Sequence, residues 1–248
     1  MRRLLPDRAD AVDPASVYAE ADRPAPLGRP WLLVNMIASA DGASSVEGRS
    51  GGLGGPADRR AFAALRSLAD VILVGAATVR AERYRPPQVA PELAAQRRAR
   101  GQAAPPQLAV VTASLDLAPD AAIFTDADNP PTLIVPGAGA ERARQRFASL
   151  GATILPAGAA SVDLAKALSA LHAGGARLVL CEGGPSLNGQ LAALDLIDEL
   201  CLTVAPVIAA GEAKRIAAGH PAPALRRLRL AQVLEEDSTL LLRYVRLR

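Results

Sequence analysis

Apolar runs alternate along the chain with polar, glycine-rich stretches. Seven of these runs are short and mostly apolar, as buried strands are: residues 31–37, 71–75, 108–111, 132–135, 152–155, 177–181 and 199–207. Apolar residues at helical spacing predict helices between them, beginning at Pro56 and covering residues 76–83, 141–150, 162–172 and 185–193. Strands that alternate with helices favour a largely parallel sheet with helices on both faces.

The two ends of the protein depart from this alternation. Residues 225–234 and 239–246 predict a terminal antiparallel hairpin, joined by a polar turn at residues 235–238. Residues 1–28 are rich in Pro, Asp and Arg, and we expect a loosely packed arm with a short helix near residues 14–21. Residues 85–106 predict a surface excursion around another short helix. No linker interrupts residues 29–248, so the prediction is one α/β domain with a mixed sheet, preceded by the arm.

Composition narrows the classes of partner. The 248 residues carry a formal charge of +3 and only 3% aromatic side chains, so an aromatic platform for nucleic acid is not expected. No apolar run reaches the length of a membrane span. Cys181 and Cys201 lie in apolar runs and predict buried free thiols in a reducing compartment, the cytoplasm. His172 and His220 are the only histidines, and no metal site is expected.

The strongest local motif begins with the apolar run 178–181 and continues as Glu182-Gly183-Gly184-Pro185-Ser186-Leu187. Glycines let a ligand approach the backbone closely, and a helix start offers free N–H groups to a diphosphate. The same pattern also fits a simple tight turn between a strand and a helix. Glu182 lies at the carboxyl end of its strand, where open sheets hold their ligands. A cationic or N–H-bearing substrate edge is the simplest partner for this acid.

A second group of polar residues follows the first apolar run. Asp41-Gly42 and the glycine-rich residues 48–55 predict a mobile lid, although a loop without any ligand role has the same composition. Asp58 falls in the first turn of the next helix, where the helix dipole also favours an acid. Arg66 stands among leucines and needs an anionic partner, from either the protein or a ligand.

Several motifs together resemble one family. They are Ala38-Ser39-Ala40-Asp41-Gly42, a strand ending at Gly75 and followed by Thr78-Val79, Glu182-Gly183-Gly184, Ile197-Asp198-Glu199-Leu200, and Ala205-Pro206. In this order they resemble the C-terminal reductase domain of the riboflavin-biosynthesis pyrimidine reductases, in the dihydrofolate-reductase-like superfamily. The resemblance implies that fold, a homodimer, and NADPH-dependent reduction of 5-amino-6-(5-phosphoribosylamino)uracil or a related pyrimidine.

The resemblance also implies roles for individual residues. Hydride transfer needs an accompanying proton, and with no histidine in the predicted site an acid or water must supply it. The candidate catalytic residues are therefore Asp58, Glu182 and Asp41. The implied substrate contacts are Ser50, Asp58, Arg66 and Glu182. The implied NADPH contacts are Ile37, Ala38, Thr78, Glu82, Ser114, Gly183, Gly184, Pro185, Ser186 and Leu187.

Departures from the family pattern leave alternatives open. The sequence has no His-x-Glu or Pro-Cys-x-x-Cys motif, so no zinc deaminase domain is expected. Gly52 replaces the family's lid tryptophan, and Glu82 replaces an aspartate of the cofactor helix. Asp58 stands where the family often has a small neutral residue, whereas dihydrofolate reductases place an acid there to bind the pterin. The alternatives are therefore a dihydrofolate or pteridine reductase and a non-catalytic NADPH-binding regulatory protein.

Overall fold

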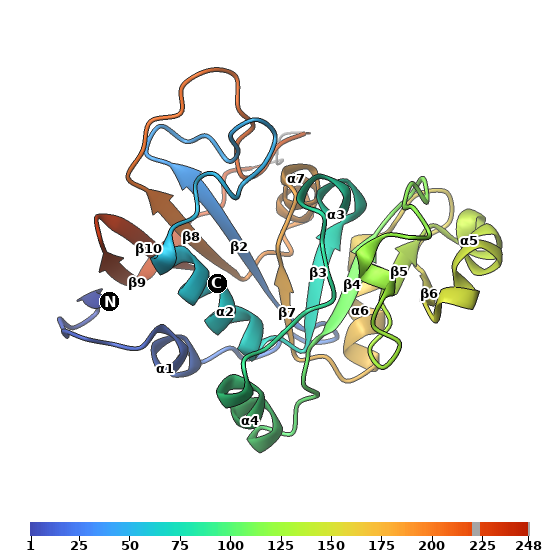
Figure 1. The fold of residues 1–248 in the computed structure, drawn as a ribbon, viewed down its shortest axis with the longest axis horizontal. Helices are drawn as coiled ribbons and strands as arrows, with labels where there is room; N and C mark the ends of the chain where they lie inside the picture. The colour runs from blue at the N-terminus through green and yellow to red at the C-terminus, as the bar shows by residue number, and fades with distance from the viewer. Residues whose placement is uncertain (220–223, 248) are drawn as a thin grey trace. The chain divides into compact units, whose positions relative to one another are not determined.

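The computed structural model describes residues 1–219 and 224–247, so His220 lies outside the described residues. The described residues form two compact units. Figure 1 labels their helices and strands. The first unit comprises residues 1–24, 32–68 and those from 180 onward, and the second comprises residues 25–31 and 69–179. Strand β7 (Leu178–Cys181) contributes residues to both units.

The first unit contains the predicted terminal hairpin. Its strands follow the order β1 (Arg2–Leu5), β9 (Leu228–Glu236), β10 (Thr239–Arg246), β8 (Glu199–Ala205) and β2 (Trp31–Ser39). Strands β1, β9, β10 and β8 pair antiparallel, whereas β2 and β8 pair parallel. The hairpin turns at Asp237 and Ser238, whose φ values of 50° and 63° suit a tight two-residue turn.

The described residues of the first unit include the helices α1 (Pro14–Ala19), α2 (Pro56–Leu68) and α7 (Pro185–Ala193). Helix α7 has the predicted bounds. Strand β8 alternates strictly between buried and half-buried residues. Its buried face carries Glu199, Cys201 and Thr203, and its other face carries Leu200, Leu202 and Val204. Strand β8 therefore presents polar groups on its buried face and leucines on its half-exposed face.

The prediction of a loosely packed N-terminal arm was wrong. Strand β1 pairs with β9, and Tyr18 on α1 is buried. The Arg23 guanidinium donates two hydrogen bonds to the Glu199 carboxylate, at 2.8 and 2.9 Å. Arg243 donates to the same carboxylate at 2.7 Å. Both arginines lower the pKa of Glu199 against the opposing effect of burial. The arm is thus fixed by a strand pairing and a buried ion-pair network.

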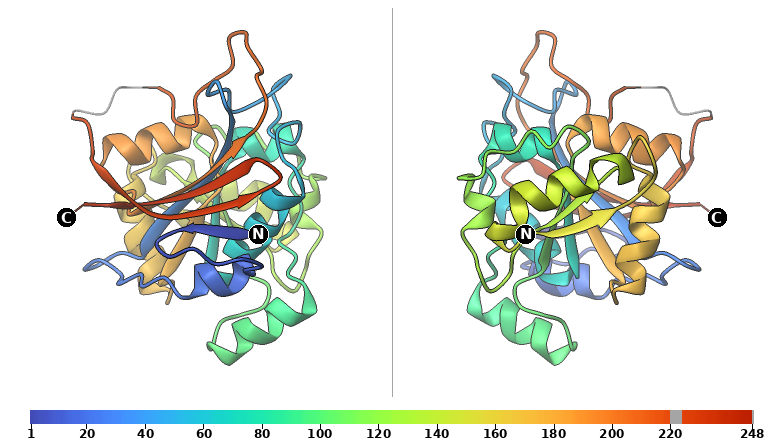
Figure 2. Two further views of the ribbon diagram at one scale, coloured as in Figure 1. Left: turned by 90° about the vertical axis from the view of Figure 1, so that its left-hand side faces the viewer. Right: turned by 90° about the vertical axis from the view of Figure 1, so that its right-hand side faces the viewer.

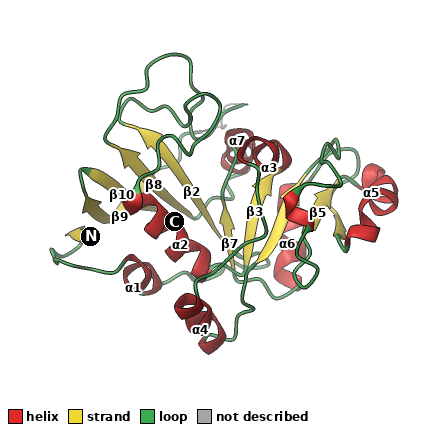
Figure 3. Ribbon diagram, viewed as in Figure 1, coloured by secondary structure: helices red, strands yellow, loops and turns green. Residues whose placement is uncertain are grey.

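The second unit has four parallel strands in the order β3 (Val71–Gly75), β4 (Gln107–Val111), β5 (Thr132–Val135) and β6 (Thr153–Pro156). Its core includes Ile72, Leu108, Leu133 and Phe147. Figure 3 distinguishes its helices from its strands. The helices are α3 (Ala76–Glu82), α4 (Pro91–Ala99), α5 (Ala140–Phe147) and α6 (Leu164–Ala173), with 3₁₀ turns at Ala122–Phe124, Gly137–Gly139 and Ala148–Leu150.

The predicted class of fold is confirmed: a mixed, mostly parallel sheet flanked by helices, with a C-terminal antiparallel hairpin. Cys181 and Cys201 are buried and free, as predicted. Among the described residues, no helix has the length and apolarity needed to cross a membrane. The same residues contain no group of three or more His, Cys, Asp or Glu side chains arranged to hold a metal ion.

Candidate active site

Asp58, one of the predicted catalytic acids, belongs to the first unit. It lies in the first turn of α2 and is half-buried. Burial raises the pKa of its carboxyl group, and a hydrogen bond from the Thr203 hydroxyl and the charge of Arg59 only partly oppose this effect. Thr203 reaches Asp58 from the buried face of β8. The environment of Asp58 therefore favours the protonated form more than water does.

Arg66 and Glu182 form an ion pair within the same unit. The Arg66 Nε and Nη2 atoms donate to the two Glu182 carboxylate oxygens, each at 2.7 Å. The Arg66 guanidinium also lies 4.2 Å from the centre of the Phe62 ring. The Glu182 side chain is 2% exposed and that of Arg66 is 18% exposed. The anionic partner that the sequence demanded for Arg66 is therefore a protein carboxylate.

Asp41 has a different environment. Its carboxylate accepts hydrogen bonds from the Ser39 hydroxyl at 2.5 Å and from the backbone N–H groups of Ala209 and Ala210 at 3.1 and 2.8 Å. These bonds lower its pKa to about 2. An acid with this pKa is ionised at neutral pH, so the geometry favours a loop-binding role for Asp41 over the predicted role as a proton donor.

The glycine turn leads from β7 into α7 as predicted. Gly183 has φ of 87°, and a Cβ atom placed on it would lie 3.1 Å from the Met36 sulfur. Gly184 is the N-cap residue, Pro185 occupies the first turn, and the helix start has no capping side chain. Within the described part of the chain, no side chain caps the N–H groups of Ser186 and Leu187 at this helix start, a position that suits an anion.

The remaining predicted residues of the first unit surround the glycine-rich loop. Ile37 packs with Leu53 and Ala205 in a small apolar cluster, which anchors the loop at Leu53. Ala38 is the next residue of β2 and is also buried. The Ser50 carbonyl accepts a hydrogen bond from the Leu53 N–H group at 2.9 Å. The glycine-rich loop predicted as a lid is therefore held by the packing of Leu53 against Ile37 and Ala205.

Three predicted cofactor contacts lie in the second unit. Thr78 and Glu82 are half-buried on α3, which begins after Gly75 without a capping side chain. Ser114 is exposed after β4, and its hydroxyl accepts from the Asp116 N–H group at 3.3 Å. The strand–turn–helix pattern predicted around Thr78 is present in this unit.

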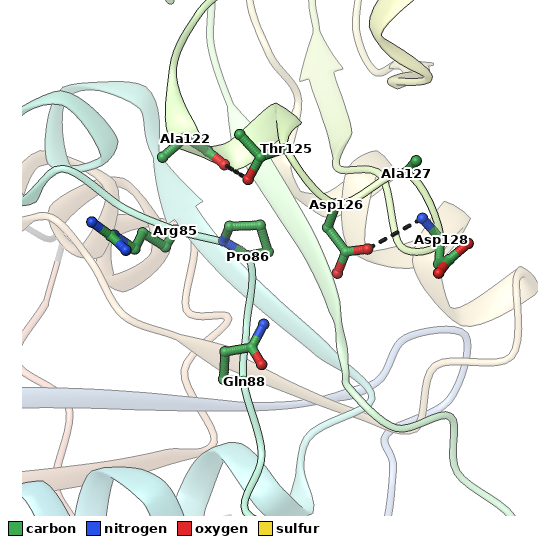
Figure 4. Close-up of a pocket in the computed structure, with 8 residues that line it drawn as sticks. All are labelled: Arg85, Pro86, Gln88, Ala122, Thr125, Asp126, Ala127 and Asp128. Atoms are coloured by element: carbon green, nitrogen blue, oxygen red, sulfur yellow. Dashed lines mark hydrogen bonds between the residues drawn. The ribbon is translucent and has the colours of Figure 1, made fainter.

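The second unit also contains an open pocket of about 820 Å³ (Figure 4). None of the predicted site residues lines it. Asp126 accepts a hydrogen bond from the Asp128 N–H group at 3.1 Å, and the Thr125 hydroxyl donates to the Ala122 carbonyl at 2.8 Å. The other lining residues are Arg85, Pro86, Gln88 and Ala127.

Two residues of the site were not foreseen from the sequence. Thr203 is a polar residue on the buried face of a strictly alternating strand, and this alternation is a signal that could have identified it. Asn188 is buried inside α7, where it donates to the Ile216 carbonyl at 2.8 Å. The sequence around Asn188 does not indicate this contact, because its partner Ile216 lies 28 positions further along the chain.

The protein belongs to the reductases of riboflavin biosynthesis. A family model described as the RibD C-terminal domain matches residues 30–242, and the chain belongs to that family. The chain is 30% identical over 184 residues to the 2,5-diamino-6-ribosylamino-4(3H)-pyrimidinone 5′-phosphate reductase of Archaeoglobus fulgidus, covering 74% of this chain and 83% of that protein.

Two further relatives place the protein within the family. It is 28% identical to the riboflavin biosynthesis protein RibD of Bacillus amyloliquefaciens, covering 74% of this chain but 47% of that longer protein. A solved pyrimidine reductase-like protein from Corynebacterium diphtheriae superposes with a TM-score of 0.82 at 28% identity, covering 96% of this chain and 100% of that one. The family resemblance predicted from the motifs is therefore confirmed.

Proposed function

We propose that this protein is a cytoplasmic, NADPH-dependent reductase that converts a ribosylaminopyrimidine 5′-phosphate to the corresponding ribitylaminopyrimidine. The observation that carries the proposal is the family match over residues 30–242. The substrate is either the 2,5-diamino-pyrimidinone in the names of the archaeal relatives or the aminouracil that differs from it at C2. The 30% identity to the archaeal reductases favours the diamino form.

The first unit has a backbone that fits one part of the cofactor. Helix α7 follows the N-cap residue Gly184, and no described side chain caps it, which suits a diphosphate group. We propose that Gly183, Gly184, Pro185, Ser186 and Leu187 hold that group, with Ile37 and Ala38 as further contacts in the same unit. The contacts expected from Thr78, Glu82 and Ser114 stay predictions. NADPH, when bound, supplies a hydride to the substrate. The protein then has to orient the substrate and deliver a proton.

Asp58 is the proposed proton source. Reduction of the imine bond at the ribosyl C1 carbon of the ring-opened substrate places a hydride on carbon and a proton on nitrogen. Burial raises the pKa of Asp58, whereas Asp41 is held as an anion. Both Glu182 oxygens accept from Arg66, so Glu182 is better suited to positioning than to proton transfer. We propose that the Arg66–Glu182 pair and Ser50 line the substrate site.

The Asp58–Thr203 pair also supports a second candidate, the reduction of a dihydropteridine. A half-buried carboxyl group next to a threonine hydroxyl can accept hydrogen bonds from the amino and ring N–H groups of a pterin. Dihydrofolate presents such an edge. The pyrimidine remains the first proposal because the family match covers most of the protein.

The loss of NADPH absorbance, followed with the purified protein and each candidate substrate, distinguishes these functions. We expect oxidation with at least one of the two pyrimidine phosphates and none with dihydrofolate. Turnover with dihydrofolate alone would favour the pteridine reductase. Tight NADPH binding without turnover of any of the three compounds would favour a non-catalytic binding protein.

We further propose that the protein forms a homodimer through the half-exposed face of β8 and β10. On this face Leu240 pairs with Val204, Leu242 with Leu202, and Tyr244 with Leu200. An apolar sheet face of this kind is stabilised by a second protein surface.

The mass of the protein in solution tests this assembly. Light scattering is expected to give a dimer for the wild type and a monomer for Leu242→Glu. Leu27→Glu, which changes a fully exposed leucine, is the matched control and should remain dimeric. A wild-type monomer at micromolar concentration would contradict the proposal.

A further inference from the structure

The segment 207–218, which we call the strap, follows β8 and runs beside the turn at residues 39–44 (Figures 1 and 2). The Ala40 N–H group donates to the Val207 carbonyl at 2.9 Å. The Lys214 carbonyl accepts from both the N–H group and the hydroxyl of Ser44, at 3.0 and 2.6 Å. Strap residues between Val207 and Lys214 are therefore bonded to the turn that carries the Ser-x-Asp-Gly motif.

The other end of the strap is bonded to helix α7. The Asn188 side-chain amide donates to the Ile216 carbonyl at 2.8 Å, and the Ala218 N–H group donates to the Pro185 carbonyl at 2.9 Å. Gly189 allows this approach, because a Cβ atom there would lie 2.9 Å from the Ala218 carbonyl carbon. The strap thus touches the helix whose first turn follows Gly183-Gly184.

Asp41 holds the strap in a conformation that its own residues disfavour. Ala210 has φ of 53°, in the left-handed region, which costs an alanine about 1 kcal/mol. The two successive N–H groups of Ala209 and Ala210 point at the Asp41 carboxylate, as in a small anion-binding nest. A charged acceptor forms stronger hydrogen bonds than a neutral one, and these bonds offset the strain.

Asn188 is the matching anchor at the second end. It is buried, its amide nitrogen bonds to the strap, and its oxygen accepts from the Cys181 thiol at 3.4 Å. Cys181 ends β7 directly before Glu182. Asn188 therefore joins the strap to both sides of the glycine turn. A movement of the strap at residue 216 would be transmitted to that turn.

We propose that the strap couples the turn at residues 39–44 to the glycine turn at residues 183–187, with Asp41 and Asn188 as positioning residues. The inference rests on the proposed reductase function, because the glycine turn at residues 183–187 and Ile37 and Ala38, directly before the other turn, are proposed to hold the cofactor. Neither of the two residues is required to touch substrate or cofactor. Loss of either anchor should release the strap and weaken cofactor binding through the other turn.

Amide hydrogen exchange tests the coupling without substrate or cofactor. In Asp41→Asn we expect the Ala218 amide, at the far end of the strap, to lose protection. In Asn188→Ala we expect the Ala209 and Ala210 amides to lose it. Asp13→Asn is the matched control, because it removes an N-cap carboxylate from α1 in the same unit and should leave both ends protected. Protection unchanged at the far end in Asp41→Asn would overturn the coupling.

A double-mutant cycle on NADPH binding tests the functional consequence. Each single variant is expected to raise the Kd about tenfold, and the double variant to be no weaker than the weaker single. Multiplied effects, about hundredfold in the double variant, would show two independent anchors and contradict the proposal. If the wild type does not bind NADPH, the proposed function fails, whereas the exchange experiment still decides whether the strap is coupled. Asp41 is exposed, so its variant is expected to fold even if Asn188→Ala does not.

Discussion

Asp58 and Thr203 contact each other although 145 positions separate them in the sequence (203 − 58). The threonine hydroxyl stabilises the ionised carboxyl group, and burial opposes it. The balance of these two effects sets the pH range in which Asp58 holds a proton. A proton donor is active below its pKa, so the rate should fall as the pH rises through that value.

Thr203→Val is expected to shift the alkaline limb of the pH–kcat profile to higher pH. The valine keeps the volume of threonine but removes the hydrogen bond that lowers the pKa of Asp58. Rates measured across the pH range with the preferred substrate check this. An unchanged or downward-shifted limb would mean that Asp58 is not the group that titrates.

The thermal stability of Asp58→Asn tests the raised pKa of Asp58 without an activity measurement. The pKa of Asp58 is higher in the folded protein than in the unfolded protein, so ionising Asp58 destabilises the folded state. This loss of stability begins as the pH rises through the unfolded-state pKa and is complete above the folded-state pKa. The variant should therefore have a higher Tm than the wild type at neutral pH. The difference should disappear below about pH 4, where the carboxyl group is protonated in both states. A lower Tm at neutral pH would contradict this interpretation.

Glu182→Gln is expected to lower the free energy of unfolding by about 3 kcal/mol, because it leaves the Arg66 charge without its carboxylate. Urea denaturation measures this. The double variant Arg66→Met/Glu182→Gln, which removes both charges, should be less destabilised than the single variant. A single-variant effect within about 0.5 kcal/mol of zero would indicate that the pair contributes little to stability.

Among the helices and strands, those whose bounds are set by neighbouring residues in the sequence could be predicted best. Helix α7 begins at Pro185 after two glycines and has the predicted bounds. Strand β1 was missed because four residues, Arg2 to Leu5, form no recognisable alternation and pair with β9 more than 200 positions away. The Arg23–Glu199 contact was missed for the same reason. Non-local partners cannot be identified from the spacing of residues along one sequence.

Gly189→Ala reverses the usual effect of this substitution in a helix. Alanine in a helix interior normally stabilises by about 0.5–1 kcal/mol relative to glycine. Here the added methyl group would collide with the Ala218 backbone and displace the strap. We expect a lower Tm together with faster exchange of the Ala218 amide. A stabilised variant with normal protection would mean that the strap does not pack closely on α7.

At the scale of the whole molecule, the class of fold and the family could be predicted because several motifs occur in a fixed order. The site was predicted less completely. The sequence identified Arg66 as needing an anion and Glu182 as a ligand-facing acid, but not that each is the other's partner. It also grouped Asp41 with the catalytic acids, because the N–H groups of Ala209 and Ala210 lie far away in the sequence. Predicting these pairings requires the fold.

The destination of the hydride tests the central claim most directly. NADPH carrying deuterium at both C4 positions is incubated with the protein and each pyrimidine phosphate, and the product is analysed by mass spectrometry and NMR. A reductase of the proposed kind gives a ribitylaminopyrimidine with one deuterium on the ribityl C1 carbon. Recovery of both pyrimidines without deuterium, while dihydrofolate gains deuterium in its ring, would contradict the account.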